Sequence, residues 1–140
     1  NETIITEPYI SIHYRNTDMK HDIRKFIKKI KRLSKYHKIK YLFLASDDYS
    51  AYDTIKKNIP HIEIIRKSHP PKDLKGDWSY EATDKNTQLY EFLRDIYFIL
   101  KSNHFIPSNK SSVSKSIIKM IQNNNTIIPN FYPNIEIHNV

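Results

Sequence analysis

The chain lacks cysteine and has a single glycine, and both shortages exclude kinds of chemistry. Without cysteine there is no disulfide, no thiolate nucleophile and no zinc site with cysteine ligands. The lone Gly76 excludes the glycine-rich phosphate loops GxGxxG and GxxxxGK(S/T) anywhere in the chain. Phosphate groups, if bound, must therefore be held by side chains and by helix N-termini.

Long hydrophobic runs are also missing, since none approaches the roughly 18 apolar residues of a membrane span. The composition, 39% hydrophobic and 27% charged over 140 residues, is that of one globular domain. None of the seven histidines belongs to an HExxH pair or a three-ligand zinc spacing, so we predict no metal site. The net charge of +8 favours an anionic partner: nucleic acid, an acidic membrane surface or a phosphate-bearing small molecule.

Strand and helix patterns alternate along the chain. Short apolar or β-branched runs predict strands at residues 9–12, 40–46, 61–65, 104–107 and 135–138. Helical spacing predicts helices over residues 22–36, 50–58, 86–101 and 113–122. The apolar positions of the third helix are Leu89, Phe92, Leu93, Ile96, Tyr97 and Leu100. The alternation predicts an α/β fold, with a parallel sheet and helices on both faces.

Polar residues of ligand-binding types follow three of the predicted strands. They are His13, Arg15 and Asp18, then Asp47 and Asp48, and last the serine-rich residues 108–112. Ligands of α/β sheets bind beyond the carboxyl ends of the strands, so we expect the three groups to converge on one crevice. The arginine fork suits a diphosphate, and the histidine and aspartates can fix a base or a sugar hydroxyl.

Each group also has a purely structural interpretation, which the sequence leaves open. The first can be an ordinary charged turn, Asp47 and Asp48 can cap the helix that follows them, and the serines can form a plain N-cap. The basic face of the helix at residues 22–36 is either solvated surface or an electrostatic platform for nucleic acid or lipid.

Four segments resemble the fucosyltransferase superfamily, which includes alpha-1,2-, alpha-1,6- and protein O-fucosyltransferases, and they occur in that family's order. Residues 12–18 (IHYRNTD) resemble its His-x-Arg-Arg-x-Asp signature, and the alpha-1,6 branch is the most similar. The other three segments are residues 42–48 (LFLASDD), 93–98 (LRDIYF) and 108–115 (SNKSSVSK). Together they span most of residues 9–120.

The resemblance implies the C-terminal, Rossmann-like half of a two-domain glycosyltransferase of the GT-B type. Residues 1–140 are then a single domain that binds the nucleotide sugar GDP-fucose without a metal or other cofactor. Fucose is transferred with inversion to the hydroxyl of a glycan or glycoprotein acceptor. Because the chain begins with Asn1 rather than methionine, we expect a fragment without the N-terminal acceptor-binding half, which binds donor at best.

By motif position, the resemblance implies a role for each candidate residue. Arg15 holds the β-phosphate of the donor, Asp18 orients Arg15, and Asp22 is a weak candidate for the general base. The remaining donor contacts are His13 and Asp95 at the guanine and ribose, Asp47 and Asp48 along the nucleotide, and Ser111 and Ser112 at the diphosphate.

One residue departs from the family signature. Asn16 stands where the family has its second arginine, which removes a positive charge from the place where charge grows on the leaving group. Two other functions therefore stay open. One is a degenerate glycosyltransferase domain that serves as a scaffold. The other is a basic module that binds nucleic acid, although nucleic acid is not the favoured partner.

Overall fold

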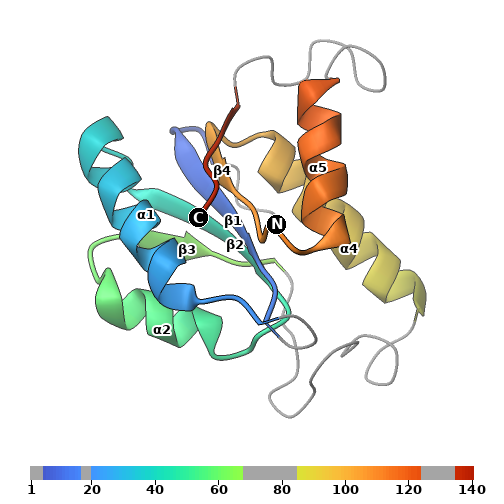
Figure 1. Cartoon of the computed structure of the whole chain (residues 1–140), viewed down its shortest axis with the longest axis horizontal. Coiled ribbons are helices and arrows are strands. Elements are labelled where there is room, and N and C mark those ends of the chain that lie inside the picture. The colour runs from blue at the N-terminus through green and yellow to red at the C-terminus, as the bar shows by residue number, and fades with distance from the viewer. Residues whose placement is uncertain (1–4, 17–19, 68–84, 124–134) are drawn as a thin grey trace.

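The computed structural model describes residues 5–16, 20–67, 85–123 and 135–140 (Figure 1). Within them, five parallel strands form one sheet in the order β3-β2-β1-β4-β5. The strands are β1 (Tyr9–Tyr14), β2 (Tyr41–Ser46), β3 (Glu63–Ile65), β4 (His104–Ile106) and β5 (Glu136–Ile137). The predicted α/β fold is confirmed, and every strand lies within two residues of its predicted limits.

The strand order creates a switch point beside the central strand. From β1 the chain adds β2 and β3 on one side, and it then returns to add β4 and β5 on the other. In the ladder His13 lies opposite Ala45 of β2, and Ile12 lies opposite Ile106 of β4. Open α/β sheets bind ligands in the crevice at such a point, beyond the carboxyl ends of the strands.

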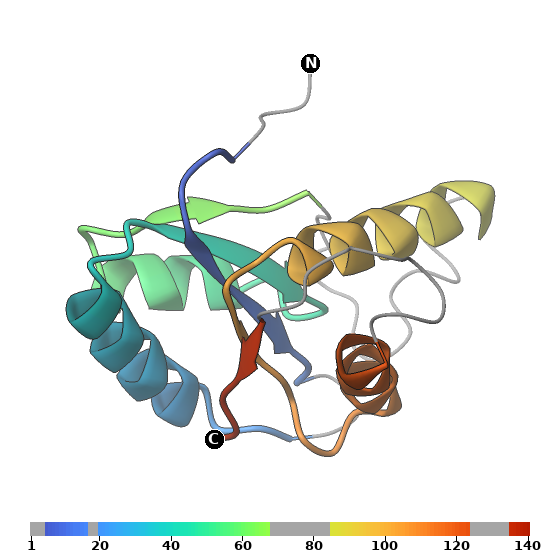
Figure 2. The ribbon, with the colours of Figure 1, turned by 90° about the horizontal axis from the view of Figure 1, so that it is seen from above.

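Of the helices that the structure describes, two cover each face of the sheet (Figure 2). The first pair, α1 (Ile23–His37) and α2 (Ala51–Asn58), packs on one face. The second pair, α4 (Lys85–Leu100) and α5 (Ser112–Gln122), packs on the other, as predicted for a sheet with helices on both faces. Of the helices that the structure describes, none combines the length and the apolar character that crossing a membrane requires.

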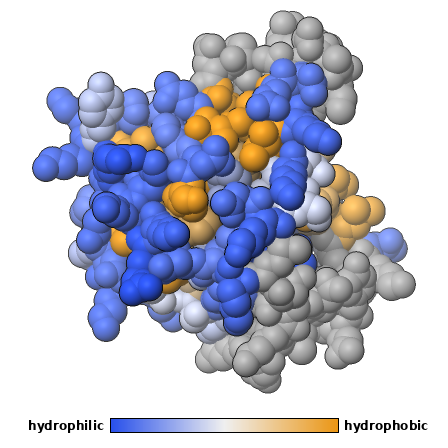
Figure 3. All heavy atoms as spheres, viewed as in Figure 1, coloured by the Kyte–Doolittle hydropathy of each residue, from blue (hydrophilic) through white to orange (hydrophobic). Residues whose placement is uncertain are grey.

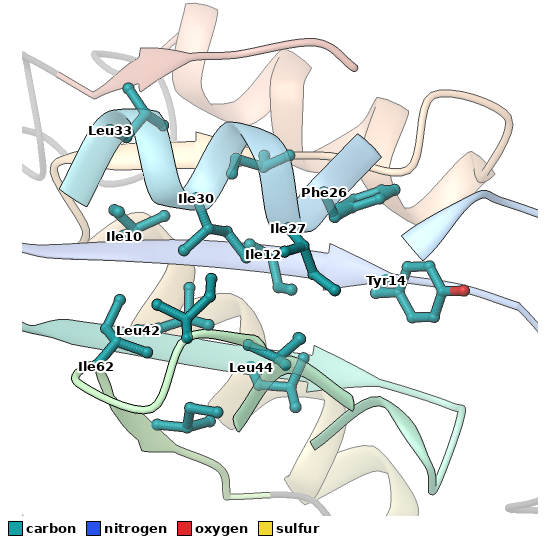
Figure 4. Packing of buried hydrophobic residues seen from close by; sticks show 14 of the residues in the cluster. Ile10, Ile12, Tyr14, Phe26, Ile27, Ile30, Leu33, Leu42, Leu44 and Ile62 are labelled. Atoms are coloured by element: carbon teal, nitrogen blue, oxygen red, sulfur yellow. The ribbon is translucent and has the colours of Figure 1, made fainter. Parts of the chain in front are cut away.

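The side chains of the central strands alternate between two cores. Ile10 and Ile12 are fully buried beneath α1, where they join Ile30 (Figure 4). Phe43 of β2 points to the other face, where its ring stacks on Phe98 of α4 with 5.1 Å between the centroids. Burial on both faces explains why β2 reads as a continuous apolar run.

Local signals determine both ends of α1. Asp22 is the N-cap, and its carboxylate accepts a hydrogen bond from the Arg24 N–H at 3.0 Å. The C-cap that follows the helix is Lys38, which has a left-handed backbone with φ of 56° and donates its N–H to the Ser34 carbonyl. Between these ends most of the basic residues are exposed, and hydrophilic residues cover this side of the molecule (Figure 3).

The apolar spacing of α4 predicted the helix correctly, and four of its six apolar positions are exposed. Leu89, Phe92, Leu93 and Tyr97 are between 43% and 56% exposed. The buried residues are those at positions 98–100, in the last turn. Figure 2 shows the reason, because the first turns of α4 extend away from the sheet and only the end of the helix lies against it.

Candidate functional site

The exits of β1 and β2 are tied together by hydrogen bonds. The Ser46 hydroxyl donates to the Tyr14 carbonyl (2.7 Å) and accepts from the Asp48 N–H (3.0 Å). Asn16 donates its backbone N–H to Asp47 (2.9 Å) and its side-chain amide to Asp48 (3.1 Å). The two aspartates therefore lie against the polar segment that follows β1.

Ser108 ties the exit of β4 to the exit of β1. Its buried hydroxyl donates to the His13 carbonyl (2.7 Å) and accepts from the Arg15 N–H (2.9 Å). Its own N–H donates to the Ser114 hydroxyl (3.0 Å), and its carbonyl accepts from the Ser111 N–H (2.9 Å). All three polar segments thus meet at the carboxyl end of β1, which is the switch point of the sheet.

An ion pair holds the Arg15 side chain at this edge. The Arg15 Nε atom lies 3.6 Å from Oδ2 of Asp47, and the two side chains are only 21% and 13% exposed. Water screens a partly buried pair less than an exposed one, so the attraction is stronger here than at an open surface. The pair positions the guanidinium between the exits of β1 and β2.

His13 is uncharged at neutral pH. Burial lowers its pKa to about 4, with further lowering by the charges of Arg15 and His21. Its Nδ1 lies 2.6 Å from the Ser114 Oγ atom, which also accepts from the Ser108 N–H. When the Ser114 hydroxyl donates its proton to Nδ1, the ring proton of His13 lies on Nε2. In this tautomer His13 is a neutral N–H donor.

Asn16 both donates and accepts at the site. Its Oδ1 accepts from the His21 N–H (3.2 Å), while its amide donates to Asp48. The His21 Nε2 accepts from the Lys110 N–H (3.4 Å), so Nδ1 carries the proton and donates it to the Arg15 carbonyl at 2.6 Å. Arginine has no acceptor atom, so the second arginine of the family signature could not make the contact with His21.

The N-terminus of α5 lies beside these residues. Ser111 is buried as the N-cap, and its hydroxyl accepts from the Ser114 N–H at 3.4 Å. The exposed Ser112 is the first residue of the helix. The first turn of a helix carries N–H groups without an intrahelical acceptor and the positive end of the helix dipole. An anion can bind to that turn, whereas the Ser111 hydroxyl already serves the cap.

Asp48 binds the N-cap residue of α2, Ser50, and not the N–H groups of the helix itself, so the predicted capping of α2 is not observed. The Asp48 carboxylate accepts from both the N–H (2.9 Å) and the hydroxyl (2.7 Å) of Ser50, immediately before α2. Burial opposes ionisation of Asp48, but the hydrogen bonds from Ser50 and Asn16 outweigh it and lower the pKa of the carboxyl. Asp48 is therefore ionised at neutral pH and committed to these two partners.

Three predicted site residues lie apart from this network or outside the described residues. Asp18 is among the residues that the structure does not describe. Asp22 caps α1, and the Arg24 side chain, which donates two hydrogen bonds of 3.0 Å, lowers the pKa of its carboxyl. Asp95 is half-buried in α4, on the same face of the sheet as α5. The binding or catalytic roles of all three stay predictions.

Sequence reasoning missed two residues of the network, Ser114 and His21. Ser114 lies three positions after Ser111, and an N-cap side chain accepts a hydrogen bond from the N–H at that spacing. The sequence therefore contained a pattern from which Ser114 could have been found. His21 lies in a connection between β1 and α1 and belongs to no local pattern.

Comparisons with known proteins bear on the fold. No protein-family model and no curated protein sequence matches the chain. Crystal structures of POFUT1 in complex with GDP-fucose and with GDP superpose on it with TM-scores of 0.60, at 13% and 12% sequence identity. Each covers 94% of this chain, which spans 41% and 42% of the two POFUT1 chains. The chain therefore has a fucosyltransferase-like, Rossmann-type α/β fold.

Proposed function

We propose that this chain is a donor-binding domain of the fucosyltransferase type, which holds GDP-fucose beyond the carboxyl ends of β1 and β4. The position of Arg15 carries the proposal. Its side chain is paired with Asp47, and its backbone N–H is bound to Ser108, shortly before the N-cap of α5. The proposal places this cationic fork and the N-terminus of α5 at one donor site.

These two groups suit a diphosphate in a chain without glycine-rich loops. Arginine can donate two parallel hydrogen bonds to phosphate oxygens, and a helix N-terminus favours negative charge. His13 offers a neutral N–H donor beside them for the base or the ribose. Two POFUT1 structures that share the fold are complexes with GDP-fucose and with GDP, which supports a nucleoside diphosphate sugar as the ligand.

The proposed reaction is a displacement at the anomeric carbon of fucose. The acceptor oxygen forms a bond to this carbon as the bond to GDP breaks, and the electron pair of that bond leaves with the β-phosphate. A general base takes the acceptor proton, while Arg15 and the N–H groups of α5 stabilise the charge on GDP. Asp22, the predicted base, is a weak candidate, because a carboxyl with a lowered pKa is a poorer proton acceptor.

Transfer, as opposed to donor binding, is proposed for a longer protein. The chain spans less than half the length of the POFUT1 chains that it resembles. The acceptor and a second, acceptor-binding domain therefore belong to the proposal rather than to the part that the structure describes.

Thermal unfolding with and without GDP tests donor binding. A ligand at about 100 times its Kd stabilises a protein by about 2.7 kcal/mol, which for a domain of this size is roughly 5 to 10 °C in Tm. We expect this shift for the unmodified chain and for Arg32→Ala, which removes an exposed arginine of α1. Arg15→Ala should lose it.

Two results would contradict the proposal. One is the absence of any shift with either GDP or GDP-fucose at millimolar concentration. The other is an equal shift in Arg15→Ala and Arg32→Ala, because binding would then not depend on the crevice at the end of β1.

A further inference from the structure

A cluster of histidines lies at the amino edge of the sheet, the edge opposite Arg15. His104 and Glu136 are the first residues of β4 and β5, and they lie opposite each other in the ladder. His138 directly follows β5, and His37 is the last residue of α1. Because parallel strands all begin at one edge, this cluster and the proposed donor crevice lie at opposite edges.

The atoms of this cluster have the spacing of metal ligands. Nδ1 of His104 lies 3.0 Å from Nε2 of His138 and 3.5 Å from Oε2 of Glu136. Nε2 of His138 and Oε2 of Glu136 lie 3.6 Å apart. A triangle with these sides has a point about 2.0 Å from all three corners, and zinc bonds to histidine nitrogen and carboxylate oxygen are about 2.0 to 2.2 Å long. One ion can therefore bind all three atoms with little movement.

His37 is in reach as a fourth ligand. One ring nitrogen of His37, one ring nitrogen of His104 and one carboxylate oxygen of Glu136 all lie within 4.8 Å of one another. The centroids of the His37 and His104 rings are 4.2 Å apart. Since His37 is exposed at the end of α1, its side chain can turn toward an ion without disturbing the core.

We propose that His37, His104, Glu136 and His138 form a zinc-binding site that joins α1, β4 and β5. Imidazole nitrogens with a carboxylate oxygen are ligands that zinc accepts in its tetrahedral sites. The site has a structural purpose. Among the described strands β5 has two residues and pairs with β4 alone, so a shared ion anchors this short edge strand to the sheet.

The surroundings of the cluster contain features that favour zinc binding and charges that oppose it. Burial lowers the pKa of His104 and of His138, so their ring nitrogens are available as neutral ligands at pH 7. Lys29 and Arg32 of α1 lie near enough to lower the pKa of His138 as well, and their charges oppose a dication. The Glu136 carboxylate offsets part of that repulsion.

A metal-free alternative fits the same contacts. Two neutral imidazoles at 3.0 Å can share one N–H···N hydrogen bond, with no ion between them. The two possibilities differ in their response to zinc, because only the metal site gives saturable binding that depends on Glu136.

Zinc titration of the 140-residue chain, freed of metal by a chelator, tests the proposal. Calorimetry should show one Zn²⁺ per chain, and the bound ion should raise Tm. Glu136→Gln and His138→Gln should each weaken binding by about tenfold or more, as loss of a ligand does. Glu136 is 63% exposed, so its substitution removes a ligand without disturbing the packing.

Two control variants test whether zinc binds at this site and not elsewhere on the chain. His61→Gln removes an exposed histidine beside β3, at the far side of the sheet from β5, and should leave zinc affinity unchanged. Arg15→Ala should also bind zinc normally, since it acts at the other edge. The absence of saturable zinc binding, or binding that persists in the double variant of Glu136→Gln and His138→Gln, would overturn the proposal.

Discussion

The Oγ atom of Ser114 lies 2.6 Å from Nδ1 of His13, although the two residues are 101 positions apart in the sequence. This contact joins the end of the central strand to the first turn of α5. The same hydroxyl accepts from the Ser108 N–H, and Ser108 in turn binds the backbone of His13 and Arg15. The shape of the proposed donor crevice therefore depends on one buried serine.

Ser114→Ala should destabilise the chain. The substitution leaves the buried Ser108 N–H without its acceptor, which costs about 1 to 3 kcal/mol of unfolding free energy. Urea unfolding measures the change. Ser116→Ala, which alters an exposed serine of the same helix, should change stability by less than about 0.5 kcal/mol. Equal effects of the two variants would show that the Ser114 hydroxyl has no such role.

His13 should make stability depend on pH. Its pKa in the folded chain is about 4, below the ordinary 6.5, so between these values the unfolded chain binds a proton that the folded chain does not. The contribution is complete above pH 6.5, falls as the pH drops toward 4, and amounts to about 3 kcal/mol at most. Urea unfolding at pH 7 and pH 4.5 should show a smaller decrease for His13→Gln than for the control His61→Gln. The same decrease in both variants would contradict this assignment.

Asn16→Ala should be less stable than the unmodified chain by about 1 to 2 kcal/mol, because it removes the contacts of the amide with Asp48 and His21. Asn16→Arg restores the family signature. It should lose the His21 contact, keep a donor to Asp48 and bind GDP more tightly, because it adds a positive charge near the diphosphate. Calorimetric titration with GDP compares the variants. Weaker GDP binding by Asn16→Arg would mean that this position does not face the phosphates.

The basic face of α1 should not contribute to GDP binding. Lys28 and Lys35 are exposed on that face, so replacing both with glutamine should leave the GDP-induced Tm shift unchanged. If the chain is instead a nucleic-acid module, it should bind RNA with steep salt dependence, and the same double variant should weaken that binding. Filter binding at two salt concentrations, beside the GDP assay, distinguishes the two functions.

Local sequence patterns were sufficient to find the helices and strands, because the buried side of each element repeats apolar residues at the spacing of a helix or a strand. The continuous apolar run of β2 and the helical spacing of α1 each predicted an element within one residue of its observed limits. For α4 the same spacing identified the helix, but only Ile96 and Leu100 of its six apolar positions pack into the core. Exposure of Leu89 and Leu93 depends on how far the helix extends past the sheet, which is a tertiary property.

The sequence by itself determined the α/β class and the edge where the site is expected, because parallel strands place their following residues at a common edge. Only the tertiary structure decided the partners: Asn16 with Asp47 across 31 positions, His13 with Ser114 across 101, and His104 with His138 across 34. Periodicity records which face of an element is buried. It does not record which distant polar atoms come within 3 Å of one another, and for that reason a search for zinc spacings along the chain passed over the histidine cluster.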